Sequence, residues 1–400
     1  MATEQKNEKD WATDYDVLDP EFTKDPYPLW GELRDKCPIA HSERWGGSWM
    51  ATRYEDMFAM AQDFRHFSNQ DILMVPRAPV DDPSAAVGAP PITADPPLHT
   101  WSRRLLLPYF SVRMVAKWEP ITRERCRSLL DGFANKGEAD AAANYAQQIP
   151  PFVVAAILGV PEDLTDTFTS WARDFFEFGL RDPERANAAR QQGLSFLGQI
   201  VQERKQKPQD DLITYLLNAE VDGQPVPEPH ILGTSLLVVL AGIDTTWNSI
   251  GSGLWYLAQH PEDCRRLVAE PDLLPTAVEE LLRAYAPVTM ARVVTEDVEY
   301  NGCQMSAGDK VILPFPAANR DPEKFPDPDE VIIDRAENPH VAFGVGIHRC
   351  LGSNLARMEM RVALEEWLAR IPSFRLKDPD AVTWVGPQIR GPRSVPVVFP

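Results

Sequence analysis

One cysteine near the C-terminal end, Cys350, lies among residues that suit a metal-binding thiolate. It belongs to the segment FGVGIHRCLG at 343–352, where His348 and Arg349 come directly before it. Positive neighbours and a helix N-terminus lower the pKa of a thiol and favour the thiolate, the form that binds metals. Residues 353–361 carry apolar side chains at helical spacing, which predicts a helix that starts just after Cys350. Free backbone N–H groups at such a start favour negative charge.

The glycines of this segment permit unusual backbone positions. Gly344 and Gly346 allow either a close approach of the backbone to a flat group or backbone angles that a side chain would forbid. The alternative for the whole segment is a buried free cysteine in a glycine-rich turn, because a single cysteine often packs as a small apolar residue.

A second candidate is the hexapeptide AGIDTT at 241–246. It lies in the stretch 231–259, which contains a single charged residue, Asp244. An unpaired carboxylate inside a buried helix costs several kcal/mol unless something compensates it. The adjacent Thr245 hydroxyl and Gly242 indicate a proton-delivery pair beside a cavity. The alternative is that Asp244 pairs with a buried cation and Thr245 bonds back to the preceding turn.

Two further pairs stand at helical spacing. His99 and Arg103 are four residues apart and share one helix face, where they could clamp a carboxylate. Glu280 and Arg283 are three residues apart, a common arrangement that adds about 0.2–0.5 kcal/mol on a helix surface. Taken alone, each pair also fits an ordinary surface contact.

In their order along the chain, these motifs resemble those of the cytochrome P450 family. The family's cysteine-ligand loop is matched by Phe343, Gly344, Gly346, His348, Cys350 and Gly352. The resemblance covers residues 99–400 and implies a mainly α fold, in which a triangular helical domain and a small β-rich lobe enclose a buried haem b. We expect a single domain over 1–400, with 1–25 as a flexible arm.

The resemblance also implies a role for each motif. Cys350 would be the axial ligand of the haem iron. Asp244 and Thr245 would be the catalytic pair that supplies protons. The haem and its propionates would be held by His99, Arg103, Arg292, Phe343, Gly344 and His348. A structural network that supports the cysteine loop would consist of Glu280, Arg283 and Arg335.

The reaction that the family implies is monooxygenation of a hydrophobic small organic molecule with O2 and two electrons. From their positions, the residues expected at the substrate are Leu237, Leu240, Ala241, Val288, Met290 and Phe176, with the loop 72–92. Two rival classes are a peroxide-driven or rearranging haem-thiolate enzyme, which would not need Asp244 and Thr245, and a non-catalytic haem sensor. Activity with peroxide alone favours the first rival, and turnover with electron donors excludes the second.

Charge and cysteine usage limit the partners and the compartment. The net charge of −19 argues against nucleic acid and anionic membranes. Five scattered cysteines without a CxxC pair indicate a reducing compartment, the cytoplasm, and the polar start at 1–16 predicts no membrane anchor. Stretch 231–259 is long enough to span a bilayer, but hydroxyl residues and glycines interrupt it, which favours a core helix.

No flavin or nicotinamide motif is present, so we expect electrons from a separate ferredoxin-type or flavodoxin-type donor with its reductase. The run 99–127 has seven Lys or Arg against two acids. Together with Arg349, Arg357 and Arg361, it predicts a positive face that an acidic donor would recognise. The alternative is a set of scattered, solvated arginines.

Overall fold

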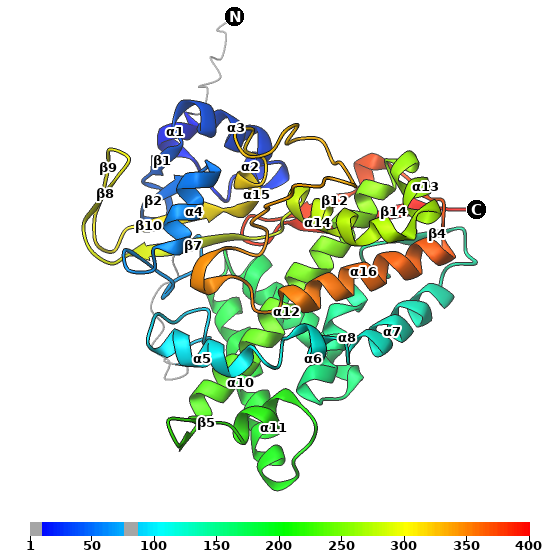
Figure 1. Cartoon of the computed structure of the whole chain (residues 1–400), viewed down its shortest axis with the longest axis horizontal. Coiled ribbons are helices and arrows are strands. Elements are labelled where there is room, and N and C mark those ends of the chain that lie inside the picture. The colour runs from blue at the N-terminus through cyan, green and yellow to red at the C-terminus, as the bar shows by residue number, and fades with distance from the viewer. Residues whose placement is uncertain (1–9, 76–86) are drawn as a thin grey trace, which may run out of the picture.

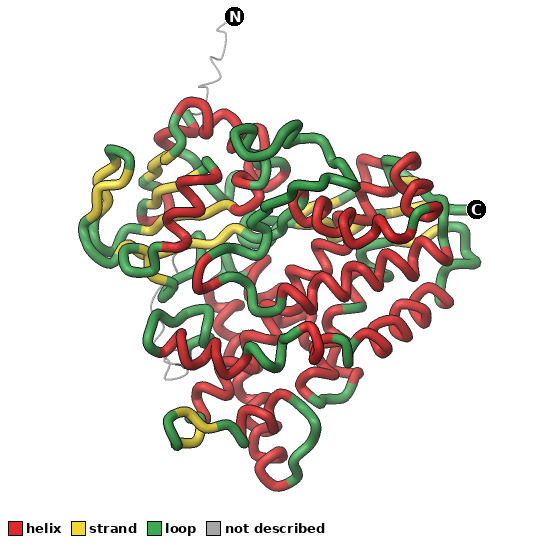
Figure 2. Tube along the Cα trace, in the orientation of Figure 1, coloured by secondary structure: helices red, strands yellow, loops and turns green. Residues whose placement is uncertain are grey.

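A computed structural model of the chain describes residues 10–75 and 87–400. The molecule is wedge-shaped, with a lobe that contains the main sheet at one corner and helices through the rest (Figure 1). The helical region and the short, local strands are distinguished by colour in Figure 2. This agrees with the expected mainly α class with a small β-rich lobe.

The largest sheet has five strands in the order β1-β2-β10-β7-β3. Strands β2 and β10 are parallel, and the other neighbours in this sheet are antiparallel. Its strands are β1 (Ile39–Ser42), β2 (Ser48–Ala51), β10 (Lys310–Pro314), β7 (Thr289–Val294) and β3 (Phe67–Ser68). The smaller sheets contain β4 (Glu138–Asp140), β5 (Glu220–Val221), β6 (Gln224–Pro225), β8 (Val298–Tyr300), β9 (Cys303–Met305), β11 (Arg375–Leu376), β12 (Thr383–Val385), β13 (Gly391–Ser394) and β14 (Pro396–Val398).

The longer helices are packed around one central helix, α12 (Glu228–Leu257). The others of nine or more residues are α3 (Tyr27–Lys36), α4 (Tyr54–Gln62), α5 (Leu98–Leu106), α7 (Glu119–Asp131), α8 (Pro150–Leu158), α9 (Thr165–Arg173), α10 (Pro183–Gln206), α13 (Pro261–Ala269), α14 (Leu274–Ala284) and α16 (Ser353–Arg370). Shorter helices are α1 (Trp11–Asp14), α2 (Pro20–Lys24), α6 (Val112–Val115), α11 (Leu212–Leu217) and α15 (Phe315–Ala318). A π-helix at Asp174–Phe178 follows α9.

Helix α12 confirms the prediction of a buried central helix. It is the single helix in the described ranges long and apolar enough to cross a membrane, but most of its apolar window is buried in the protein. Glycines let neighbours approach it closely, because a Cβ at Gly251 would meet Pro392 at 3.1 Å, and one at Gly233 would meet the backbone oxygen of Gly88 at 2.1 Å. The helix is therefore a core element with tightly fitted neighbours.

The expectation of a flexible arm over 1–25 is wrong for residues 10–25. Helices α1 and α2 form there, and the side chains of Trp11, Tyr15 and Phe22 are buried in one apolar cluster. The Tyr15 hydroxyl also donates to the Ser48 carbonyl oxygen at 2.6 Å. Burial of three aromatic rings offsets the entropy of ordering this segment. Residues 1–9 lie outside the described residues.

The proline-rich segment 69–98 forms no helix in its described parts before α5 begins at Leu98. Its first part is fastened by Gln388, whose Oε1 accepts from the Met74 N–H at 2.9 Å and whose Nε2 donates to the Thr289 carbonyl at 2.6 Å. Its second part leads to Pro91 and the start of α5. The stretch 76–86, the middle of the expected substrate loop, lies outside the described residues.

Candidate active site

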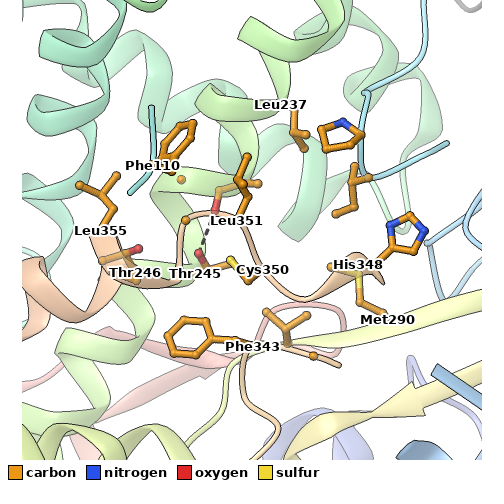
Figure 3. Close-up of a pocket in the computed structure, with 18 of the residues that line it drawn as sticks. Phe110, Leu237, Thr245, Thr246, Met290, Phe343, His348, Cys350, Leu351 and Leu355 are labelled. Carbon is orange, nitrogen blue, oxygen red and sulfur yellow. Dashed lines mark hydrogen bonds between the residues drawn. The ribbon is translucent and has the colours of Figure 1, made fainter. Parts of the chain in front are cut away.

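One large cavity lies between α12 and the cysteine loop (Figure 3). Its empty space is about 1450 Å³, including the part open to solvent, and its surface is mostly apolar. Among its lining residues, those predicted from the sequence are Arg103, Leu237, Ala241, Thr245, Val288, Met290, Arg292, Phe343, Gly344, His348 and Cys350. These predicted residues come from four separate parts of the sequence and meet at one site.

The cysteine loop has the backbone that its glycines predicted. Gly344 has φ +66° and Gly346 has φ +69°, values that favour glycine. The Cys350 N–H donates to the Phe343 carbonyl at 2.7 Å and closes the loop. Helix α16 begins three residues later, at Ser353, so Cys350 lies just before a helix N-terminus as expected. The loop thus holds the sulfur in place through its own backbone.

The sulfur of Cys350 faces the cavity from inside the protein. Burial raises the pKa of the Cys350 thiol, while the Gly352 N–H and the charge of Arg103 act in the opposite direction. A cation bound at the sulfur would also lower the pKa of this thiol, because a metal ion stabilises the thiolate. The geometry suits a single thiolate ligand that points into the cavity.

Nitrogen-bearing side chains converge at one edge of the cavity. The rings of His99 and His348 lie 4.3 Å apart, and the Nε2 atom of each is buried without a hydrogen-bond partner. Arg292 is 3% exposed, and its Nη1 donates to the Ala291 carbonyl at 2.8 Å. Burial lowers the pKa of Arg292 to about 10, although Asp95 opposes this shift. With Arg103, this edge offers donors and positive charge to an anion.

On α12, two rows of side chains spaced by four residues face the cavity. They are Thr234, Val238, Gly242 and Thr246, and Leu237, Ala241, Thr245 and Ser249. The Thr245 hydroxyl donates to the Ala241 carbonyl at 2.8 Å and lies on the cavity side (Figure 3). The predicted alcohol therefore lines the cavity, and its back-bond to the preceding turn is present as well.

Asp244 belongs to a different row of α12, and its side chain does not line the cavity. Its Oδ1 accepts from Arg393 Nη2 and from Asn248 Nδ2, each at 3.0 Å, while Oδ2 is buried without a partner. Burial raises the pKa of Asp244, although Arg393 opposes the shift. The buried cation that the alternative interpretation required is thus present. Arg393 is 149 residues away, so no local pattern pointed to it.

The two predicted pocket residues Leu240 and Phe176 do not line the cavity, and this part of the prediction is wrong. Leu240 shares the row of Asp244 and packs into the core. Phe176 lies in the π-helix, where the wider turn changes the direction of side chains, and it packs edge-on to Phe175 at 4.9 Å. Helical phase, rather than proximity in sequence, decides which residues reach the site.

A buried ionic network joins α14 to the segment 319–338, which precedes the cysteine loop. The carboxylate of Glu280 accepts from Arg283 Nη2 and Nε at 2.8 Å and from Arg335 Nε at 3.1 Å. Both Glu280 and Arg283 are fully buried, and Arg283 also donates to the Asn319 carbonyl at 2.9 Å. The structure thus brings together the three residues that the sequence grouped as a structural network.

Glu279 is a structural residue of the site that the sequence reasoning missed. Its carboxylate accepts from Arg357 Nε at 2.6 Å and lies 3.0 Å from His340 Nε2. Burial raises the pKa of Glu279, but these two partners outweigh it and lower the pKa to about 2. The Arg357 guanidinium lies 4.4 Å from the centre of the Phe343 ring, at the start of the cysteine loop. In the sequence, the one indication of this role was that Glu279 stands directly before Glu280 of the predicted network.

The expected positive face is much smaller than the run of cations suggested. Acids neutralise several members, because Arg123 and Arg127 bind Glu366 and Arg361 binds Glu119 and Glu365. Of the cations predicted for this face, Arg104, Arg113, Lys117 and Arg349 are exposed and have no ion-pair partner. These four lie near one another, since the Asn354 side chain at the start of α16 donates to the Phe110 carbonyl between α5 and α6.

The cytochrome P450 family profile matches residues 74–383. The chain belongs to the cytochrome P450 family. It is 35% identical over 379 residues to the mycinamicin IV hydroxylase/epoxidase of Micromonospora griseorubida, covering 92% of this chain and 94% of that protein. It is 34% identical over 372 residues to the vitamin D(3) 25-hydroxylase of Pseudonocardia autotrophica, covering 90% of each.

A solved structure agrees with this assignment. The polyketide synthase cytochrome P450 PksS of Bacillus subtilis has a TM-score of 0.88 with 31% identity, over 96% of this chain and 99% of that one. This cytochrome P450 is therefore a haem b monooxygenase that uses O2, an organic substrate and redox partners.

The site fits this cofactor on the observations above. A sulfur faces the cavity, apolar walls suit a porphyrin ring, and the unpartnered ring nitrogens of His99 and His348 stand with Arg103 and Arg292 where two carboxylates need donors. Glycine at position 344 also suits a tightly packed cavity wall, because a Cβ added there would lie 3.4 Å from the Phe315 ring.

Proposed function

We propose that this cytochrome P450 hydroxylates a hydrophobic organic molecule held under α12, with Cys350 as the thiolate ligand of the haem iron. One observation carries the proposal: Cys350 and Thr245 line the same cavity, from the loop and from the central helix. When bound, haem supplies the redox-active iron that activates dioxygen. His99, Arg103, Arg292 and His348 hold its propionates through charge-assisted hydrogen bonds.

The side chains that would face the substrate are mostly apolar. Leu237, Ala241, Val288 and Met290 line the cavity, and Pro91 and Ile92 add an apolar edge from the loop before α5. Burial of a hydrophobic molecule against such a wall contributes about 25 cal/mol per Å² of apolar surface removed from water. The testing experiment is a screen of hydrophobic compounds for the absorbance change that follows displacement of iron-bound water. Failure of all apolar compounds, with binding only of polar ones, contradicts the proposal.

Thr245 supplies the hydroxyl on the cavity side, and Asp244 holds a proton one position away on α12. We expect Thr245→Ala to retain haem but to divert electrons to hydrogen peroxide, so that product per electron pair falls several-fold. Thr245→Ser keeps the hydroxyl and serves as the matched control. The measurement compares product, peroxide and electron donor consumed. Tight coupling in Thr245→Ala refutes the role of the hydroxyl.

Electrons enter, on this proposal, at the surface formed by the four unpaired cations Arg104, Arg113, Lys117 and Arg349. The side chains of Leu107 and Val112 stand among them and are 49% and 72% exposed. A ring of cations around apolar side chains suits an acidic ferredoxin-type or flavodoxin-type donor, since charge steers the encounter and apolar contact holds the complex. The half-buried thiols of Cys37 and Cys303 are free, which fits a cytoplasmic location.

Reversal of one cation at this surface tests the docking proposal. We expect Arg113→Glu or Arg104→Glu to slow reduction by a plant-type ferredoxin about tenfold at low ionic strength, with less effect at high salt. Arg265→Glu on α13 makes the same change in net charge on an exposed residue elsewhere and is the control. The measurement is the rate of reduction by stopped-flow absorbance. Equal rates for the three variants would exclude this surface as the docking site of the donor.

The rival peroxide-driven chemistry has a direct test. The cavity-facing hydroxyl of Thr245 favours a reaction that needs delivered protons. Efficient product formation with hydrogen peroxide, and none with electron donors, would assign the protein to the rival class.

A further inference from the structure

The side chain that compensates Asp244 belongs to the C-terminal hairpin and is shared with a second carboxylate. Arg393, on β13, donates from Nη2 to Asp244 Oδ1 and from Nε to Glu177 Oε2, both at 3.0 Å. Its Nη1 donates to Asn248 Oδ1 at 2.8 Å. All three nitrogens of one guanidinium are therefore used in a single buried network.

The hairpin is fixed on α12, so Arg393 cannot easily move away from the helix. A Cβ at Gly391 would lie 2.3 Å from the Cβ of Asn248, which means that the strand approaches α12 as closely as glycine allows. The Gln147 side chain donates to the Arg393 carbonyl at 2.8 Å and holds the strand from the other side. The guanidinium thus occupies a fixed position between its two carboxylates.

Glu177 stands on a different part of the fold. It lies in the π-helix between α9 and α10, two helices that pack on α12. Arg173 on α9 holds its carboxylate with bonds of 3.0 and 3.3 Å. Further along α10, Arg190 donates to the Val87 carbonyl at 2.6 Å, in the loop that carries the cavity residue Ile92. The position of Glu177 is therefore linked to a segment that borders the substrate.

We propose that Arg393 is a positioning residue that divides its charge between Asp244 and Glu177, and so ties the proton affinity of Asp244 to the placement of α9 and α10. This rests on the proposed function of Asp244 as a proton donor behind Thr245. The charged groups that face the Asp244 carboxyl are Arg393 from β13 and Glu177 from the π-helix, with the neutral Asn248 on α12 itself. Movement of Glu177 toward Arg393 or away from it changes how strongly the positive charge of Arg393 stabilises the Asp244 carboxylate.

Opposite shifts in titration are the signature of this arrangement. Removal of the cation in Arg393→Gln favours the protonated acid, so the midpoint for Asp244 rises by about one pH unit or more. Removal of the competing anion in Glu177→Gln leaves the cation to Asp244, so the midpoint falls. Arg393→Lys restores the positive charge and moves the midpoint back toward that of the natural protein. A residue with a merely structural role would not give shifts of opposite sign.

The experiment is infrared difference spectroscopy of the haem-loaded protein across a pH series. The carbonyl band of the protonated carboxyl is assigned by its loss in Asp244→Asn. Arg185→Gln, which removes a cation that binds Asp174 in the same segment, is the control and leaves the midpoint unchanged. Opposite shifts in Arg393→Gln and Glu177→Gln support the proposal. No shift in either variant, or shifts of the same sign, overturns it.

A second measurement separates this proposal from the function on which it rests. The ratio of product to peroxide is followed over the same pH range in the same variants. If the infrared midpoints shift as expected and this ratio follows them, both proposals stand. If the midpoints shift but the ratio does not, the positioning role of Arg393 stands and the proton-donor function of Asp244 fails.

Discussion

Replacement of Glu280 by alanine is expected to lower the free energy of unfolding by about 3–5 kcal/mol, because it leaves two buried guanidinium groups without their counter-ion. Both Arg283 and Arg335 bind this one carboxylate, and Arg283 is fully buried. The backbone N–H of Ile332 and the side chain of Asn338 also lose their acceptor. The loss is read from urea unfolding followed by far-ultraviolet circular dichroism.

A surface ion pair provides the matched control for this substitution. Glu119 binds Arg123 and Arg361, but its side chain is 32% exposed. Exposed pairs of this kind contribute about 0–1 kcal/mol. Glu119→Ala is therefore expected to cost far less than Glu280→Ala. If both variants lose the same stability, the buried network stabilises the fold no more than an exposed ion pair does, and the prediction is wrong.

Replacement of Cys350 by serine is expected to abolish monooxygenase turnover while the protein remains folded. A serine hydroxyl occupies almost the same space, so the loop closed by the backbone bond to Phe343 is retained. The hydroxyl does not supply the electron donation of a thiolate, on which oxygen activation in this family depends. Product formation with electron donors and the content of bound haem are both measured.

Cys303→Ser is the control for this variant. Cys303 is a half-buried thiol on β9, outside the cavity lining. The same atom exchange is expected to leave turnover unchanged there. If Cys350→Ser retains turnover, the iron has another ligand and the account of the site is wrong.

The local chemistry of the site was accessible from the sequence because each motif is short. The cysteine loop, the pair Glu280 and Arg283, and the apolar stretch of α12 are each fixed by spacing within one element. Positive φ at Gly344 and Gly346 follows from the same local logic. Helical phase also explains why Leu240 was wrongly predicted to line the cavity, since it shares the row of Asp244 that faces away from the cavity.

Long-range partners were not accessible in this way. The pairing of Asp244 with Arg393 and Glu177 depends on how the C-terminal hairpin and the π-helix are placed on α12. The positive face was overestimated for a similar reason, because Glu365 and Glu366 of α16 neutralise arginines of α7. The burial of Trp11 and Phe22 likewise requires a surface that the first 25 residues do not contain.

The most direct test of the central claim, a thiolate from Cys350 on the haem iron, is the absorbance spectrum of the reduced protein with carbon monoxide. We expect the strongly red-shifted Soret band of a thiolate-bound haem in the natural protein and its loss in Cys350→Ser. The same band in both proteins, or its absence from the natural protein, would contradict the account.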